Sequence, residues 1–152
     1  MITQSEFKAA HKRVKEILSK AGVFVRNDEI EQMEIVDFGL SELDLSGAQI
    51  ITLVDTESIA VKLLVLFPNQ TEPEHKHPPL GDYIGKEKII RCEWGKLYVY
   101  GPGEATPNPK GHTPDQRHIR KKGLRILGNL FSCNGVVIAH HIGILIYLIC
   151  SN

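Results

Sequence analysis

The sequence predicts a mainly β domain, a small barrel or sandwich, that begins with one amphipathic helix. Three observations support this fold class. Apolar residues recur at helical spacing near the N-terminus, short β-branched runs bounded by turn residues follow, and a stretch dense in glycine and proline interrupts the second half. The chain has 152 residues, which is the size of a single domain with its own core.

The expected helix spans residues 3–21. Thr3 and Glu6 have the spacing of a capping box, in which each side chain satisfies a free backbone amide of the first turn. Gly22 suits the left-handed conformation that commonly follows the last helical residue. We expect one stripe of this helix to cover a side of the β domain. Its apolar members are Phe7, Ala10, Val14, Ile17, Leu18 and Ala21.

The β pattern follows the helix and extends to residue 100. Residues 88–100 predict a hairpin that turns near Gly95, and residues 101–114 predict a loop. Residues 118–152 start with a basic cluster and continue as an apolar run without alternation. We therefore expect one domain of residues 1–117 and a divergent apolar tail of residues 118–152. The other expected strands are residues 34–40, 48–55 and 59–67.

The bulk composition restricts the classes of function. Lys plus Arg and Asp plus Glu each total 18, so no basic field is available for a nucleic-acid backbone or an anionic membrane. Three cysteines without CxxC spacing favour a reducing cytosol. The N-terminus is polar from the third residue, which predicts no signal peptide. We therefore expect a cytoplasmic protein with no nucleic-acid or membrane partner.

Two histidines form the most informative motif of the chain. His75 and His77 follow the apolar strand of residues 59–67. Residues i and i+2 of an extended chain point to the same face, so both imidazoles can reach one ion. Histidines in an exposed surface loop are the alternative. We interpret the pair as metal ligands.

The surroundings of this pair resemble one protein family. The segment 67–79, with its Pro-Glu-His-Lys-His-Pro-Pro core, and the segments 85–88, 91–100 and 36–40 resemble the D-lyxose isomerase family of cupins over about residues 3–117. The resemblance implies a small cupin β-barrel (a double-stranded β-helix, jelly-roll-like). It also implies a divalent ion, usually manganese with cobalt or zinc as alternatives, and a pentose or hexose sugar as the small-molecule partner. A homodimer would be usual for a cupin of this size.

The resemblance also implies roles for individual residues. His75 and His77 would be metal ligands, with Glu87 as the local carboxylate ligand. Lys62 matches an active-site lysine of the family, whose ammonium polarises a substrate hydroxyl or neutralises an enediolate. A solvent-exposed strand lysine is the alternative for Lys62. The implied reaction interconverts D-lyxose and D-xylulose by moving a proton between C2 and C1 through an enediol.

The chain departs from the family pattern at two places. Counting back from Gly95 places Lys88, not Glu87, at the usual glutamate position, and a one-residue slip in a strand reverses the face of a side chain. Either a local bulge lets Glu87 reach the ion, or the Lys88 ammonium takes the place of the carboxylate. The turn that carries the family's last histidine ligand has no match in residues 118–152. A truncated or frame-disrupted isomerase gene is one hypothesis for this second departure.

Three functions therefore remain open. The first is a metal-dependent aldose–ketose isomerase. The second is a degenerate, non-catalytic cupin that binds a metal or a sugar weakly. The third is another metal cupin, such as an oxygenase that holds iron with the same two histidines.

For Trp94 the sequence leaves two interpretations open, since its ring suits either a sugar pocket or the core.

Overall fold

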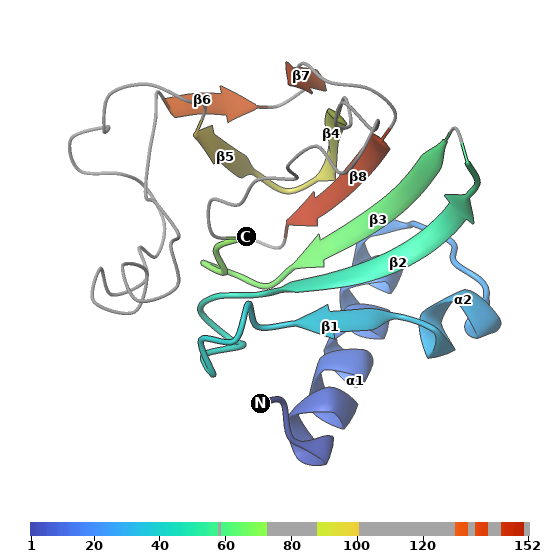
Figure 1. The fold of residues 1–152 in the computed structure, drawn as a ribbon, viewed down its shortest axis with the longest axis vertical. Helices are drawn as coiled ribbons and strands as arrows, with labels where there is room; N and C mark the ends of the chain where they lie inside the picture. Colours follow the sequence, from blue (N-terminus) through green and yellow to red (C-terminus); the bar gives the residue numbers. More distant parts are fainter. Residues whose placement is uncertain (58, 73–87, 101–129, 134–135, 140–143, 151–152) are drawn as a thin grey trace.

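The computed structural model describes residues 1–57, 59–72, 88–100, 130–133, 136–139 and 144–150 (Figure 1). This part of the chain is mainly β with an N-terminal amphipathic helix, which confirms the predicted fold class. Closure of the strands into a barrel stays a prediction. The elements are α1 (Gln4–Ala21), α2 (Asn27–Glu31), β1 (Glu34–Val36), β2 (Ala48–Asp55), β3 (Ala60–Leu66), β4 (Lys88–Trp94), β5 (Leu97–Tyr100), β6 (Leu130–Cys133), β7 (Val136–Ala139) and β8 (Ile144–Cys150).

The strands form two sheets. The larger sheet has six strands in the order β1-β2-β3-β8-β4-β7, and the smaller one pairs β5 with β6. Strands β1, β2 and β3 are antiparallel neighbours, whereas β8 runs parallel to both β3 and β4. In Figure 1, α1 and α2 lie beside β1 and β2, and the β5–β6 pair lies at the opposite end of the view.

Helix α1 has the predicted caps. The Thr3 hydroxyl accepts a hydrogen bond from the Glu6 backbone N–H at 3.2 Å, and the Glu6 carboxylate accepts one from the Thr3 N–H at 2.7 Å. Gly22 ends the helix with φ = 68°, and its N–H donates to the carbonyls of Leu18 and Ser19. The predicted stripe is largely buried, but Phe7 at its N-terminal end is 42% exposed.

The large sheet has two different faces. On one face, Ile51, Leu63 and Val65 pack in the same core cluster as the buried residues of α1. On the other face, Leu64 and Leu66 belong to a second cluster that contacts the half-buried Ile90 and Leu97. Side chains alternate between faces along a strand. We name the face away from α1 the far face; on β3 it carries Ala60, Lys62, Leu64 and Leu66.

The first predicted strand is shorter than expected, because residues 37–40 form a turn instead of continuing β1. The Leu40 N–H donates to the Asp37 carbonyl at 2.9 Å, and the Gly39 N–H donates to the Asp37 carboxylate at 2.8 Å. Both Phe38 and Gly39 have positive φ angles, of 51° and 68°. The aspartate side chain thus offers the backbone a local partner that competes with strand pairing.

The prediction of a hairpin over residues 88–100 was wrong in its pairing. Two strands form there, β4 and β5, and Gly95 lies between them with φ = 86°. However, β4 pairs with β7 and β8, whereas β5 pairs with β6 in the other sheet. The register of β4 against β8 also shifts between Cys92 and Trp94. Such a bulge bends a strand. Here the chain passes from one sheet to the other between β4 and β5.

Candidate functional site

Lys62 is the one predicted site residue that the structure describes. It lies on the far face of β3, half-buried, with Thr52 of β2 as its cross-strand partner and Ile146 of β8 on the other side. Its neighbours along this face of β3 are the buried Ala60 and Leu64. The ammonium therefore projects from a wall whose other members on the same strand are aliphatic.

The ammonium of Lys62 can donate hydrogen bonds but cannot accept them. Among the described residues, no carboxylate forms an ion pair with it; their side-chain ion pairs are Arg13–Asp44, Arg26–Asp28, Arg26–Glu29 and Arg91–Glu93. A cation on a partly buried apolar wall is costly unless an anion or hydrogen-bond acceptor meets it. A substrate oxygen is one acceptor of this kind.

The predicted metal ligands His75, His77 and Glu87 lie outside the described residues. What the structure describes is the strand that begins directly after Glu87. Lys88, the first residue of β4, pairs with Ile144 of β8, which in turn pairs with Ala60 of β3. The backbones of Lys88 and Ala60 are therefore separated by two strand spacings, or about 10 Å. The backbone next to Glu87 therefore lies at the end of the sheet where Lys62 lies.

The chain that leads toward the histidines leaves β3 through a defined turn. Pro68 and Asn69 occupy its two central positions, and the Gln70 N–H donates to the Phe67 carbonyl at 3.0 Å. Asn69 has φ = 60°, the left-handed value that the third residue of a type II turn adopts. After the turn, Thr71 forms a parallel β-bridge with Ser46. The direction of the chain is thus fixed shortly before His75.

No group of three or more His, Cys, Asp or Glu side chains that could hold a metal ion occurs within the described residues. A resident metal would therefore need ligands from the rest of the chain, where His75, His77 and Glu87 lie. Two imidazoles and a carboxylate form a mixed nitrogen and oxygen donor set. Such a set suits manganese, cobalt or zinc better than it suits a soft metal, which prefers thiolate ligands. The donor chemistry thus fits the implied ion.

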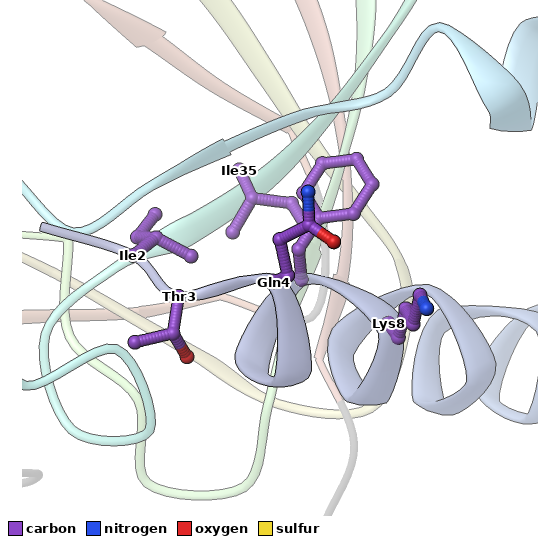
Figure 2. Close-up of a pocket in the computed structure, with 6 residues that line it drawn as sticks. Ile2, Thr3, Gln4, Lys8 and Ile35 are labelled. Atoms are coloured by element: carbon purple, nitrogen blue, oxygen red, sulfur yellow. The ribbon is translucent and has the colours of Figure 1, made fainter.

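One pocket of the described residues lies elsewhere. It has a volume of about 510 Å³ and lies at the N-terminal end of α1 (Figure 2). Ile35 points from β1 toward the first turns of α1, on the helix-side face of the sheet. Lys62 is on the opposite face, so this pocket is not part of its surroundings. The lining residues are Ile2, Thr3, Gln4, Phe7, Lys8 and Ile35.

The sequence left two interpretations open for Trp94, a sugar pocket or the core, and the structure places it in the core. It is partly buried and packs against the cluster that contains α1, which is the face opposite Lys62. Gln70 carries no signal in the sequence as a functional residue. It is 8% exposed and hydrogen-bonded through both ends of its amide. The adjacent Pro68-Asn69 pair is typical of a type II turn and could have indicated the turn. Burial of the amide is visible only in three dimensions.

Comparison with known protein families finds no match. Comparison with individual proteins finds clear relatives. The chain is 41% identical to D-lyxose ketol-isomerase of Thermofilum sp. over 117 residues, which are 77% of this chain and 65% of that protein. It is 42% identical to D-lyxose/D-mannose isomerase of Thermosediminibacter oceani over 114 residues, or 75% of this chain and 63% of the relative.

A third relative, D-lyxose ketol-isomerase of Cohnella laeviribosi, is 41% identical over 110 residues, which are 72% of this chain and 60% of that protein. The chain thus spans less than two thirds of the length of each of these curated relatives. The similarity covers about three quarters of the chain itself, which agrees with the resemblance seen in the sequence. Over this shared stretch the chain is similar to proteins named for the isomerisation of D-lyxose or of D-lyxose and D-mannose.

Proposed function

We propose that this chain is a metal-dependent aldose–ketose isomerase that interconverts D-lyxose and D-xylulose through an enediol. The observation that carries the proposal is the 41–42% identity to three relatives named for the isomerisation of D-lyxose or of D-lyxose and D-mannose. The position of Lys62 on the far face is consistent with it.

In this proposal His75, His77 and Glu87 hold a divalent ion, with manganese first and cobalt or zinc as alternatives. Bound there, the ion would supply positive charge where negative charge builds on the sugar oxygens at C1 and C2. Mixed imidazole and carboxylate ligands favour such ions. The neighbouring β4 backbone starts at the sheet end that carries Lys62, so the ligands and the lysine can belong to one site.

Lys62 would act on the substrate rather than on the ion. Its ammonium can donate a hydrogen bond to a sugar hydroxyl or to the oxygen that becomes negative in the enediolate. The aliphatic residues beside it on β3 would lower the local polarity, which strengthens such an interaction. The proton that leaves C2 is delivered to C1 by a base. Lys62 of β3 and Ile90 of β4, which both pair with residue 146 of β8, would form part of the floor of the sugar site.

The proposal is tested by following D-xylulose formation from D-lyxose, and the reverse reaction, with added Mn²⁺. We expect turnover that EDTA removes and that Mn²⁺ restores, and we expect His75→Ala to lack it. An enzyme that consumes oxygen without isomerising either sugar would contradict the proposal and favour the iron oxygenase. Purified chain that holds a metal but turns over neither sugar would favour a non-catalytic cupin.

The non-catalytic alternative has one specific observation in its favour. Lys88 occupies the position at which cupins usually place their glutamate ligand, next to Glu87. The pair Glu87→Gln and Lys88→Glu separates the two interpretations. If Glu87 is the ligand, the first substitution weakens Mn²⁺ binding by more than tenfold and the second changes it little. If Lys88 faces the ion, Lys88→Glu strengthens binding by well over tenfold and Glu87→Gln has little effect.

The remaining parts of the proposal concern partners and location. A free pentose or hexose sugar is the proposed ligand, a homodimer the proposed assembly, and the cytoplasm the proposed compartment. Among the described strands, the short β1 lies at an edge of the large sheet, and an edge strand can pair with a second copy. Sedimentation equilibrium would test the assembly, because a dimer has twice the 17.0 kDa of one chain. None of the described helices is long and apolar enough to span a membrane.

A further inference from the structure

We propose that Thr52 and Asp55 of β2 bind the hydroxyl groups of the sugar beside Lys62, and that these three side chains together recognise a neutral polyhydroxyl compound. We name Lys62, Thr52 and Asp55 the polar cluster. The inference deepens the proposed function and rests on it, because it concerns the residues that hold the sugar.

The register of β2 against β3 places the three side chains on the far face. Thr52 lies directly opposite Lys62, and Asp55 lies directly opposite Ala60, the residue two positions before Lys62. Residues directly opposite each other in an antiparallel pair point to the same face, with Cβ atoms about 4.5–5.5 Å apart. The hydroxyl of Thr52 is therefore the nearest polar neighbour of Lys62 on β2.

A β-bulge in β2 gives Asp55 its position. The register shifts between Thr52 and Val54, so that Val54 lies opposite Val61 and Asp55 lies opposite Ala60. In a regular strand Val54 would follow Thr52 on the far face, and Asp55 would point to the side of α1. Bulges commonly redirect a side chain in this way. Here the bulge brings a carboxylate to the face of Lys62 and takes an apolar side chain away from it.

The rest of the far face on these two strands is aliphatic. Thr52 and Lys62 are half-buried on it, whereas Asp55 is exposed at the end of β2. A polar group on an apolar wall gains most from a ligand that completes its hydrogen bonds. The aliphatic members are Ala48, Ile50, Ala60, Leu64 and Leu66.

The polar cluster has its hydrogen-bonding capacity available for a ligand. Its three side chains make no hydrogen bond or ion pair with any other residue in the part of the chain that the structure describes. Asp55 is a diagonal neighbour of Lys62, and such neighbours lie about 7–8 Å apart. The carboxylate and the ammonium therefore do not neutralise each other directly, and one small molecule can contact both.

The chemistry of the polar cluster matches a sugar better than it matches an anion. An ammonium only donates hydrogen bonds, a carboxylate only accepts them, and a hydroxyl does both. Neighbouring sugar hydroxyls also donate and accept, so one diol can use all three groups. A phosphate or carboxylate ligand would be attracted by Lys62 but repelled by Asp55. The polar cluster therefore favours an uncharged polyol.

The test measures binding of D-arabinitol by isothermal titration calorimetry in the presence of Mn²⁺, because this alditol of D-lyxose cannot isomerise. We expect Thr52→Val to weaken binding by about three- to tenfold, the effect of one lost hydrogen bond. Thr52→Ser, which keeps the hydroxyl, should change it by less than about twofold. Asp55→Asn should weaken it by about threefold or more. The matched control is Glu16→Gln, which removes a carboxylate from the exposed surface of α1 and should leave binding unchanged.

Kinetics with D-lyxose provide a second readout, and circular dichroism checks that each variant is folded. In Thr52→Val we expect KM to rise by the same factor as the dissociation constant of D-arabinitol, with kcat changed by less than about twofold, since a lost binding contact raises KM alone. Unchanged affinity and KM in either folded variant, Thr52→Val or Asp55→Asn, would overturn the inference. An equal loss in Thr52→Ser and Thr52→Val would also overturn it, because the methyl group and not the hydroxyl would then matter.

The two readouts distinguish this inference from the proposed function. D-arabinitol binding that Thr52→Val weakens, in a chain that turns over neither sugar, would overturn the proposed isomerase and support the polar cluster. Turnover of D-lyxose with the same KM in the unmodified chain and in Thr52→Val would support the isomerase and overturn the inference. Neither binding nor turnover in the unmodified chain would overturn both.

Discussion

Lys62 is the residue on which the chemical interpretation depends most directly. The residue is half-buried and stands between aliphatic neighbours on the far face of β3. We predict that Lys62→Met lowers kcat for D-lyxose by on the order of 10²-fold or more, because groups that act on a developing charge commonly contribute that much. Mn²⁺ affinity should change by only a few-fold, since the lysine is not a ligand.

The control for this substitution is Lys12→Met, which removes the same charge from the exposed surface of α1. We expect it to leave kcat unchanged. Isomerase activity that survives in Lys62→Met at the level of this control would show that Lys62 is an ordinary strand lysine.

His11 gives a prediction about stability rather than activity. Burial, and then the positive charge of Lys15, lower the pKa of His11 from its ordinary value of 6.5. Its Nε2 atom is buried without a hydrogen-bond partner within the described residues. The unfolded chain therefore binds the proton more readily than the folded one. The stabilising contribution is complete above pH 6.5 and is lost as the pH falls through the lowered pKa.

Urea unfolding at pH 8 and at pH 5 would measure this effect. We expect the free energy of unfolding to fall between the two pH values by less in His11→Leu than in the unmodified chain. The difference between the two chains isolates His11 from the other histidines. An equal fall in both chains would exclude His11 as a contributor.

At the scale of the element, α1 is attached to the sheet by a narrow buried stripe. Ile17 is 5% exposed within the cluster that includes Ile51 and Leu63. We predict that Ile17→Ala lowers the free energy of unfolding by about 2–5 kcal/mol, the usual cost of such a cavity. Phe24→Ala is the control, because Phe24 is 90% exposed and should change stability by about 0.5 kcal/mol at most. Similar losses in both variants would contradict this account of the core.

Elements with a local cause were predictable from the sequence, and those with a distant cause were not. Thr3, Glu6 and Gly22 act within a few residues of themselves, so the helix and both of its caps were correctly predicted. The strands that pair with β4 are β7 and β8, which lie more than forty residues farther along the chain. A Gly between two apolar runs therefore suggested a hairpin that the fold does not form.

The same limit applies to the candidate site. Lys62 was selected from the sequence by its resemblance to a family lysine, and the structure adds the face on which it lies. Thr52 and Asp55 could not be selected in this way, because their place beside Lys62 follows from the register of β2 against β3 and from the bulge within it. His75, His77 and Glu87 stay predictions, since they lie outside the described residues.

At the scale of the whole molecule, β8 joins the two halves of the large sheet. It lies between β3 and β4 and pairs with both, although it belongs to the segment that the sequence analysis set apart as a tail. We predict that the amides of β8 exchange with solvent as slowly as those of β2 and β3, because a strand paired on both sides has few free N–H groups. Hydrogen exchange followed by mass spectrometry would measure this. Exchange of β8 at the rate of an unstructured peptide would contradict its place in the sheet and support a disrupted tail.

The central claim is that this domain holds one divalent ion through His75 and His77. Elemental analysis of the purified chain, loaded with Mn²⁺ and freed of excess ion, tests that claim most directly. We predict about one equivalent of manganese in the unmodified chain and a near-complete loss of it in His75→Ala and in His77→Ala, with all three chains equally folded. Equal metal content in the three chains, or none in the unmodified chain, would contradict the account.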